Sequence, residues 1–141
     1  MLKMSLELPV NATPENIWRV YSEFSLRRQW ETDLESYELD GPFAEGVGGT
    51  MQLEGMPPIR FVFTEVQTNK SFRDAVDLGG MGRLEFGHEI SERDGRRFVE
   101  HSISLLPKYC EITNENYAFF QKVTGDMTDV LWRLKILAES L

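Results

Sequence analysis

Two histidines and an aspartate are the residues of this sequence best placed to do chemistry. His88 and His101 are the only histidines of the chain, and each stands in a run where apolar and polar residues alternate. Successive side chains of a β-strand point to opposite faces, so the alternation places both histidines on the apolar face of a hairpin. A turn at Asp94-Gly95 pairs residues that are equally far from it in sequence, which sets His88 directly opposite His101.

Asp74 occupies the corresponding face of the preceding run, in which Phe72, Asp74 and Val76 alternate with polar or small residues. This register predicts that Asp74 lies opposite His88 or diagonal to it. An Asp-His-His group on an apolar wall is a candidate general acid/base unit, or an anchor for a ligand carbonyl. We therefore take His88, His101 and Asp74 as candidate catalytic residues. The alternative is a structural role, with each histidine bonded to the other, to a water or to a tyrosine.

Aromatic and methionine side chains elsewhere are candidates for the rest of a ligand pocket. At their spacings such residues also serve as plain core. The Asp-His-His group offers three metal ligands, but no further supporting group is apparent, so we expect neither a metal nor another cofactor. The candidate ligand-binding residues are Trp30, Phe86, His88, His101, Tyr109, Phe120 and Met127.

The elements that must position these residues form one α+β domain over residues 1–141. Residues 2–8 alternate as a strand, Thr13-Pro14-Glu15 begins a helix, and a second short helix is expected at 26–30. Glycine, proline and asparagine turn signals then separate further strands, expected at 34–40, 49–54, 60–68, 71–78, 82–92 and 97–106.

The inward face of the strand at 60–68 stays open, because its pattern suits either Phe61 and Phe63 or Val62, Thr64 and Val66. Regular alternation places Glu65 on the same face as the two phenylalanines. The choice decides the charge of any pocket on that face.

The C-terminal residues 115–140 predict one long amphipathic helix, in which Gly125 permits a bend. Only this helix is long enough to cover the apolar face of a seven-stranded antiparallel sheet, and a curved sheet leaves a cavity beside it. Trp132 and Ile136 fall outside the apolar arc of the helix. They form a patch suited to dimerisation or pack beneath a loop, and we favour packing.

Composition excludes several classes of partner. A net charge of −8 argues against nucleic acid and against an anionic membrane surface. No apolar run is long enough for a membrane span, and the first residues do not resemble a signal peptide. The single cysteine, Cys110, suits a reducing compartment. We therefore expect a cytoplasmic protein without membrane insertion, as a monomer or a homodimer.

Several segments resemble one structural superfamily. They are VNATPENIW at the first helix (10–18), Trp30 after the second, GPFAEGVGG at 41–49 and LKILAE at 134–139. In these the chain resembles the helix-grip (SRPBCC, START-like) superfamily, which holds the birch pollen allergen, START lipid-transfer domains and polyketide cyclases. The resemblance implies a curved sheet wrapped around a long C-terminal helix, with a pocket between them. It carries no catalytic residue over.

Three functions follow as hypotheses. The first is binding of a small apolar or aromatic ligand, lipid- or polyketide-like, in an internal cavity. The second is a cyclase- or dehydratase-type enzyme that uses His88, His101 and Asp74 for proton transfer. The third is a protein-interaction module that acts through the outer face of the sheet. The first two require a cavity that reaches solvent, and the second also requires polar contacts among the three named residues.

Overall fold

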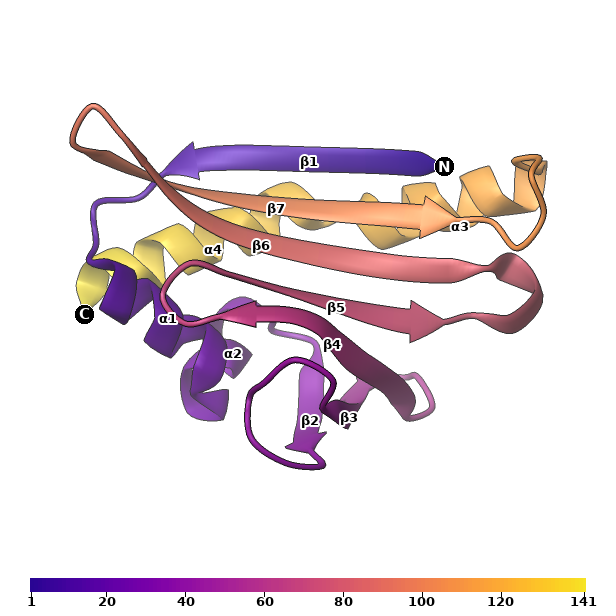
Figure 1. The fold of residues 1–141 in the computed structure, drawn as a ribbon, viewed down its shortest axis with the longest axis horizontal. Coiled ribbons are helices and arrows are strands. Elements are labelled where there is room, and N and C mark those ends of the chain that lie inside the picture. Colours follow the sequence, from indigo (N-terminus) through magenta and orange to yellow (C-terminus); the bar gives the residue numbers. More distant parts are fainter.

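Seven strands form one antiparallel sheet in the computed structural model, which describes all of residues 1–141 (Figure 1). The strand order is β1-β7-β6-β5-β4-β3-β2, so the last six strands form a meander and the first strand pairs with the last. The predicted α+β fold is confirmed. The strands are β1 (Leu2–Pro9), β2 (Leu34–Leu39), β3 (Gly48–Leu53), β4 (Ile59–Gln67), β5 (Ser71–Asp77), β6 (Arg83–Arg93) and β7 (Arg96–Leu106).

Two short helices follow the first strand, as predicted: α1 (Pro14–Ser22) and α2 (Phe24–Trp30). The Thr13 hydroxyl caps α1 by accepting a hydrogen bond from the backbone N–H of Asn16 at 3.1 Å. A short 3₁₀ turn, η1 (Gly79–Met81), joins β5 to β6.

The predicted C-terminal helix is present over residues 114–140 as two consecutive helices, α3 (Asn114–Thr124) and α4 (Met127–Ser140). The break falls at Gly125, whose N–H bonds the carbonyl of Lys122, three residues earlier, at 3.4 Å. Glycine is a poor helix former, so the interruption lies where the sequence permits a bend.

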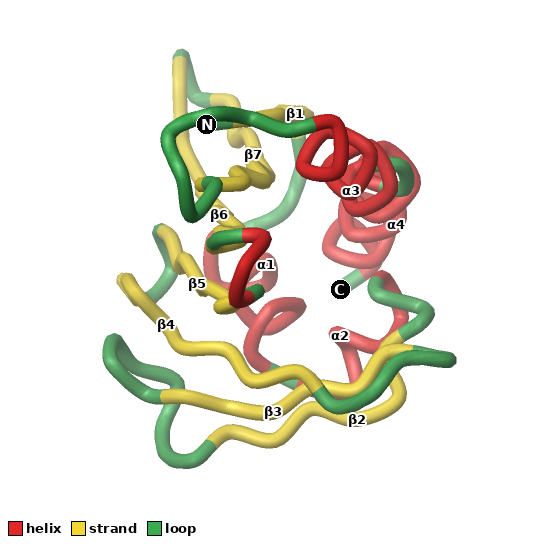
Figure 2. The backbone as a smooth tube through the Cα atoms, turned by 90° about the vertical axis from the view of Figure 1, so that its right-hand side faces the viewer, coloured by secondary structure: helices red, strands yellow, loops and turns green.

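The sheet curls so that its concave face encloses the helices (Figure 2). The close backbone contacts of α3 and α4 are with β1, β7 and the two N-terminal helices. These two helices therefore cover one side of the concave face, and β3 to β5 curve away from them (Figure 2). None of the helices is long and apolar enough to cross a membrane.

A β-bulge decides the inward face of β4. Phe61 and Phe63 are buried on the concave side. The register shifts between Phe63 and Glu65, after which Glu65 pairs with Arg73 and Val66 pairs with the buried Phe72. Paired residues share a face, so the bulge turns Glu65 outward and Val66 inward. The expectation that Glu65 shares the face of the phenylalanines is wrong, because one inserted residue reverses the alternation.

Trp132 and Ile136 are 52% and 55% exposed on α4. The prediction that they pack beneath a loop is therefore wrong, because no neighbouring segment covers them.

Candidate functional site

The histidine hairpin has the register that the sequence predicts. His88 on β6 pairs with His101 on β7, and Arg93 pairs with Arg96 across the Asp94-Gly95 turn. Both imidazoles are 6% exposed on the concave side. Asp74 on β5 pairs with Phe86, the residue two before His88, and so lies diagonal to that histidine.

Each histidine is bonded to a group outside the predicted Asp-His-His unit. His101 Nε2 and the Tyr21 hydroxyl of α1 form a hydrogen bond of 2.8 Å. His88 donates from Nδ1 to the carbonyl of Phe72 at 3.1 Å, and its ring stacks on the Phe72 ring with centroids 3.9 Å apart. The two imidazole centroids are 4.8 Å apart, but no hydrogen bond joins any two of His88, His101 and Asp74. Proton transfer by these three residues stays a prediction.

Burial keeps both histidines uncharged at neutral pH. It lowers the pKa of His101 to about 3, and the positive charge of Arg27 acts in the same direction. Burial also holds the pKa of His88 well below its usual range, with His101 and Arg27 adding to the effect. A neutral His88 that donates from Nδ1 leaves Nε2 as an acceptor. The two histidines therefore present hydrogen-bonding groups that carry no charge.

A buried arginine lies close to this aromatic wall. Arg27 of α2 is 4% exposed, and its Nη2 donates to Glu31 at 3.2 Å. Its guanidinium carbon lies 4.4 Å from the centroid of the Tyr37 ring, a cation–π contact. The Nε and Nη1 atoms of Arg27 and the hydroxyl of Tyr37 are buried without a partner in hydrogen-bond geometry, although Arg27 acts on the Tyr37 hydroxyl at short range. Unsatisfied buried donors are rare in folded proteins, so this group calls for an explanation.

Asp74 belongs to the same buried environment. Its carboxyl group is near enough to Arg27 for each to affect the other's charge, yet no ion pair within 4.0 Å joins them. Burial raises the pKa of Asp74 to about 7, an effect that Arg27 opposes and Glu31 reinforces. Burial also disfavours the charge on Arg27, but Glu31, Tyr37 and Asp74 outweigh it and keep its pKa above the ordinary value. The interior thus holds a fixed positive charge and a carboxyl that titrates near neutral pH.

Little in the sequence indicates that Arg27 is buried beside the histidines. It stands four residues before Glu31, and an Arg–Glu pair at this spacing is typical of a solvent-exposed helix face. The only available signal is that Trp30, three residues away, lies on the same side of the helix. Burial of the guanidinium depends on the position of β2, which helix periodicity does not reveal.

The other predicted pocket residues divide into three groups by their exposure. Trp30, Phe120 and Met127 are buried in the core, and the Trp30 ring lies beside His101 with centroids 5.8 Å apart. Phe86 is partly buried on the concave face. Tyr109 is apart from all of them, 72% exposed in the loop between β7 and α3.

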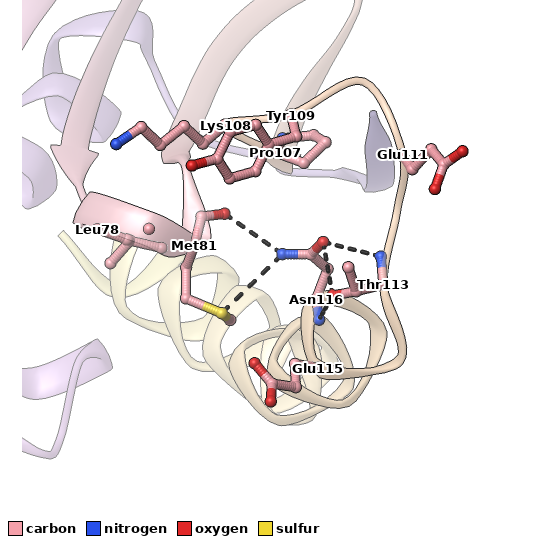
Figure 3. A pocket seen from close by; sticks show the side chains of 10 residues that line it. Leu78, Met81, Pro107, Lys108, Tyr109, Glu111, Thr113, Glu115 and Asn116 are labelled. Carbon is pink, nitrogen blue, oxygen red and sulfur yellow. Dashed lines mark hydrogen bonds between the residues drawn. The ribbon is translucent and has the colours of Figure 1, made fainter.

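Two hollows of the structure lie near this loop, away from the histidines. One of about 420 Å³ lies between η1 and residues 107–116 (Figure 3), where the Asn116 amide donates to the carbonyl of Met81 at 3.3 Å. The other, of about 510 Å³, lies among the ends of β4 to β7. Neither is lined by His88, His101 or Asp74, so neither coincides with the predicted pocket. No group of three or more His, Cys, Asp or Glu side chains is arranged to hold a metal ion.

The fold defines an α+β helix-grip protein, in which a curved antiparallel sheet holds C-terminal helices. The sequence matches the family described as polyketide cyclase / dehydrase and lipid transport over residues 1–139, and the chain belongs to this family.

Solved structures share the fold at low sequence identity. Ara h 8.0201 has a TM-score of 0.76 at 11% identity over 99% of each chain. A protein from Mesorhizobium loti, MLL2253, has a TM-score of 0.76 at 12% identity, over 99% of this chain and 98% of the other. The Aha1 dimer from Colwellia psychrerythraea has a TM-score of 0.72 at 19% identity, over 99% of this chain and 97% of the other. At these identities the likeness shows the fold alone. None of the curated proteins matches the sequence.

Proposed function

We propose that this protein binds a small apolar or aromatic molecule, of lipid or polyketide type, between the concave face of the sheet and helices α3 and α4. Membership of a family described by polyketide chemistry and lipid transport supports this class of ligand. The fold supports the location, since α3 and α4 approach β1 and β7 and leave the remaining concave face less closely covered.

The observation that carries the proposal is apolar surface on the inside of the sheet that remains partly exposed. Tyr37 on β2, Met51 on β3 and Phe86 on β6 pack against the core but keep part of their surface accessible. Tyr37 pairs with Met51 and stacks on the buried Phe61, so Tyr37 and Met51 face the concave side. Phe86 pairs with the buried Asp74 and faces the same side. Concave apolar surface with a few polar groups nearby is the usual character of a small-molecule site.

Polar groups at one end of this surface support a ligand with at least one hydrogen-bonding group. The free donors of Arg27, the Tyr37 hydroxyl and the neutral His88 all lie on this side of the sheet. Arg27 and Tyr37 have no partner for these groups within the protein, so a ligand that hydrogen-bonds to them gains up to about 1–3 kcal/mol for each. A bare hydrocarbon is therefore a poorer fit than an amphiphilic molecule.

The test is titration by calorimetry with four probes: 2-naphthamide, 2-naphthoate, decanamide and decanoate. Saturable 1:1 binding of at least one is expected. Val123→Trp places bulk on the partly buried face of α3 and should block binding, whereas Val62→Trp on the exposed outer side of β4 should not. Failure of all four probes to bind, or equal loss in both variants, would refute the proposal.

A further inference from the structure

Arg27 and Asp74 are two buried ionisable groups that influence each other without touching. Arg27 is 4% exposed and Asp74 is 5% exposed, and no hydrogen bond or ion pair within 4.0 Å joins them. Two nitrogens of Arg27 have no acceptor, although a guanidinium forms strong hydrogen bonds with carboxylates. Arg27 therefore keeps unused hydrogen-bond donors at a position where the protein carries a buried positive charge.

We infer that the ligand carries a carboxylate or a comparable acidic head group, an inference that rests on the proposed function. This head group accepts hydrogen bonds from Arg27 and from the Tyr37 hydroxyl. The apolar body of the ligand then lies along the partly exposed concave surface that includes Met51 and Phe86. The site is specific for apolar acids over their neutral analogues.

The surroundings of Arg27 fix its guanidinium for this role. The guanidinium carbon lies 4.4 Å from the ring of Tyr37, 5.7 Å from that of Trp30 and 5.8 Å from that of Phe72. Glu31 accepts from Nη2 alone, leaving the donors of Nε and Nη1 free. A side chain held among aromatic rings loses little further freedom when it binds an anion, which favours affinity.

The charges near Asp74 determine the protonation state in which an acidic ligand can bind beside it. The charged or titratable groups around this carboxyl are Arg27, Glu31 and Tyr37 on the helix and β2 side, and Arg73 and His88 on the sheet. Burial holds the pKa of His88 well below its usual range, so His88 carries no charge at neutral pH. Two carboxylates close together do not both ionise readily, so the ligand anion binds while Asp74 is protonated. The ligand then supplies the negative charge near Arg27 that Asp74 supplies in its absence.

This arrangement predicts a pH dependence that neutral ligands lack. Asp74 titrates near pH 7. Affinity for 2-naphthoate and decanoate should therefore be constant between about pH 5 and 6, where the acids are ionised and Asp74 is protonated, and fall by up to about tenfold per pH unit above pH 7. The amides should bind with little change over the same range. Asp74→Asn should remove the pH dependence of acid binding, since the amide carries no titrating proton.

The experiment compares the two acids with the two amides on the wild type, Arg27→Met and Arg28→Met. Arg28 is the exposed neighbour on the same helix and serves as the matched control. The wild type should prefer each acid over its amide by about tenfold or more at pH 6, the size expected for hydrogen bonds to a charged group. Arg27→Met should abolish that preference, and Arg28→Met should retain it.

Each other outcome overturns a defined part of the account. Equal binding of acid and amide by the wild type would mean that the free donors of Arg27 serve only water, and the inference fails while the proposed function stands. Loss of preference in Arg28→Met as well would show a surface-charge effect and also refute it. Binding of none of the probes would refute the proposed function itself. If Arg27→Met does not fold, the pH profiles of the wild type and Asp74→Asn decide, and a profile unchanged by that substitution refutes the inference.

Discussion

The hydroxyl of Tyr21 and the Nε2 atom of His101 lie 2.8 Å apart and form a hydrogen bond that joins α1 to the inner face of β7. Both side chains are buried, and the Tyr21 ring also packs edge-on against Phe72 and His88. This bond gives one of the two histidines a structural partner in the protein. It also holds α1 against the strand that carries the candidate site.

Replacing Tyr21 with Phe should therefore destabilise the protein by about 1–3 kcal/mol, because a nitrogen of His101 loses its partner in the buried interior. The measurement is the free energy of unfolding in urea. Tyr117→Phe is the control, since Tyr117 is 53% exposed and solvent reaches its side chain. Equal stability of the two variants would show that the Tyr21–His101 bond contributes nothing.

His101 should make the protein less stable in acid. Its pKa is 6.5 in the unfolded chain and about 3 in the folded one, so between these values the unfolded state binds more protons. The contribution of His101 to the free energy of unfolding is thus complete above pH 6.5 and falls by up to about 1.4 kcal/mol per pH unit below it. His101→Gln should flatten this fall between pH 6 and 4. A pH profile parallel to that of the wild type would contradict the pKa shift.

Asp74 should make the protein less stable as pH rises. Its pKa is 3.8 when unfolded and about 7 when folded, so the folded state binds more protons between these values and is destabilised as pH rises. Asp74→Asn avoids this cost. Relative to the wild type, the variant should gain stability between pH 4 and 8, by at most about 4 kcal/mol. A difference in the free energy of unfolding that stays constant with pH would show that the carboxyl titrates normally.

Gly49 should be sensitive to substitution because the ring of Phe61 packs against it. A Cβ atom there would lie 2.4 Å from Phe61 and 2.8 Å from the carbonyl oxygen of Glu38. Gly49→Ala should cost about 1–3 kcal/mol through overpacking. Gly80→Ala is the control, because a Cβ at Gly80 meets no atom within 4 Å. Thermal unfolding of the two variants should separate them clearly, and equal melting temperatures would mean that this part of the sheet relaxes freely.

The sequence predicts the strands and their pairing well, because these depend on local alternation and on turns. The register of His88 and His101 follows from the Asp94-Gly95 turn, and the structure confirms it. The orientation of Glu65 does not follow, since a single inserted residue in β4 reverses the alternation.

The candidate site is harder to predict than the fold. Its most distinctive member is Arg27, which in the sequence forms a surface-like pair with Glu31. Tyr37 and Phe72, from strands distant in the sequence, lie against its guanidinium in the fold. Contacts of that kind depend on the curvature of the sheet, which hydrophobic periodicity does not encode.

The proposed ligand lies in the concave interior and not in either of the two hollows near residues 107–116. Backbone amide NMR signals that shift when 2-naphthoate is added distinguish these positions. The shifts should be concentrated at Tyr37, Met51 and Phe86, on the inner face of the sheet. Shifts concentrated at Gly80, Lys108 and Asn116, which line the first hollow, would contradict it.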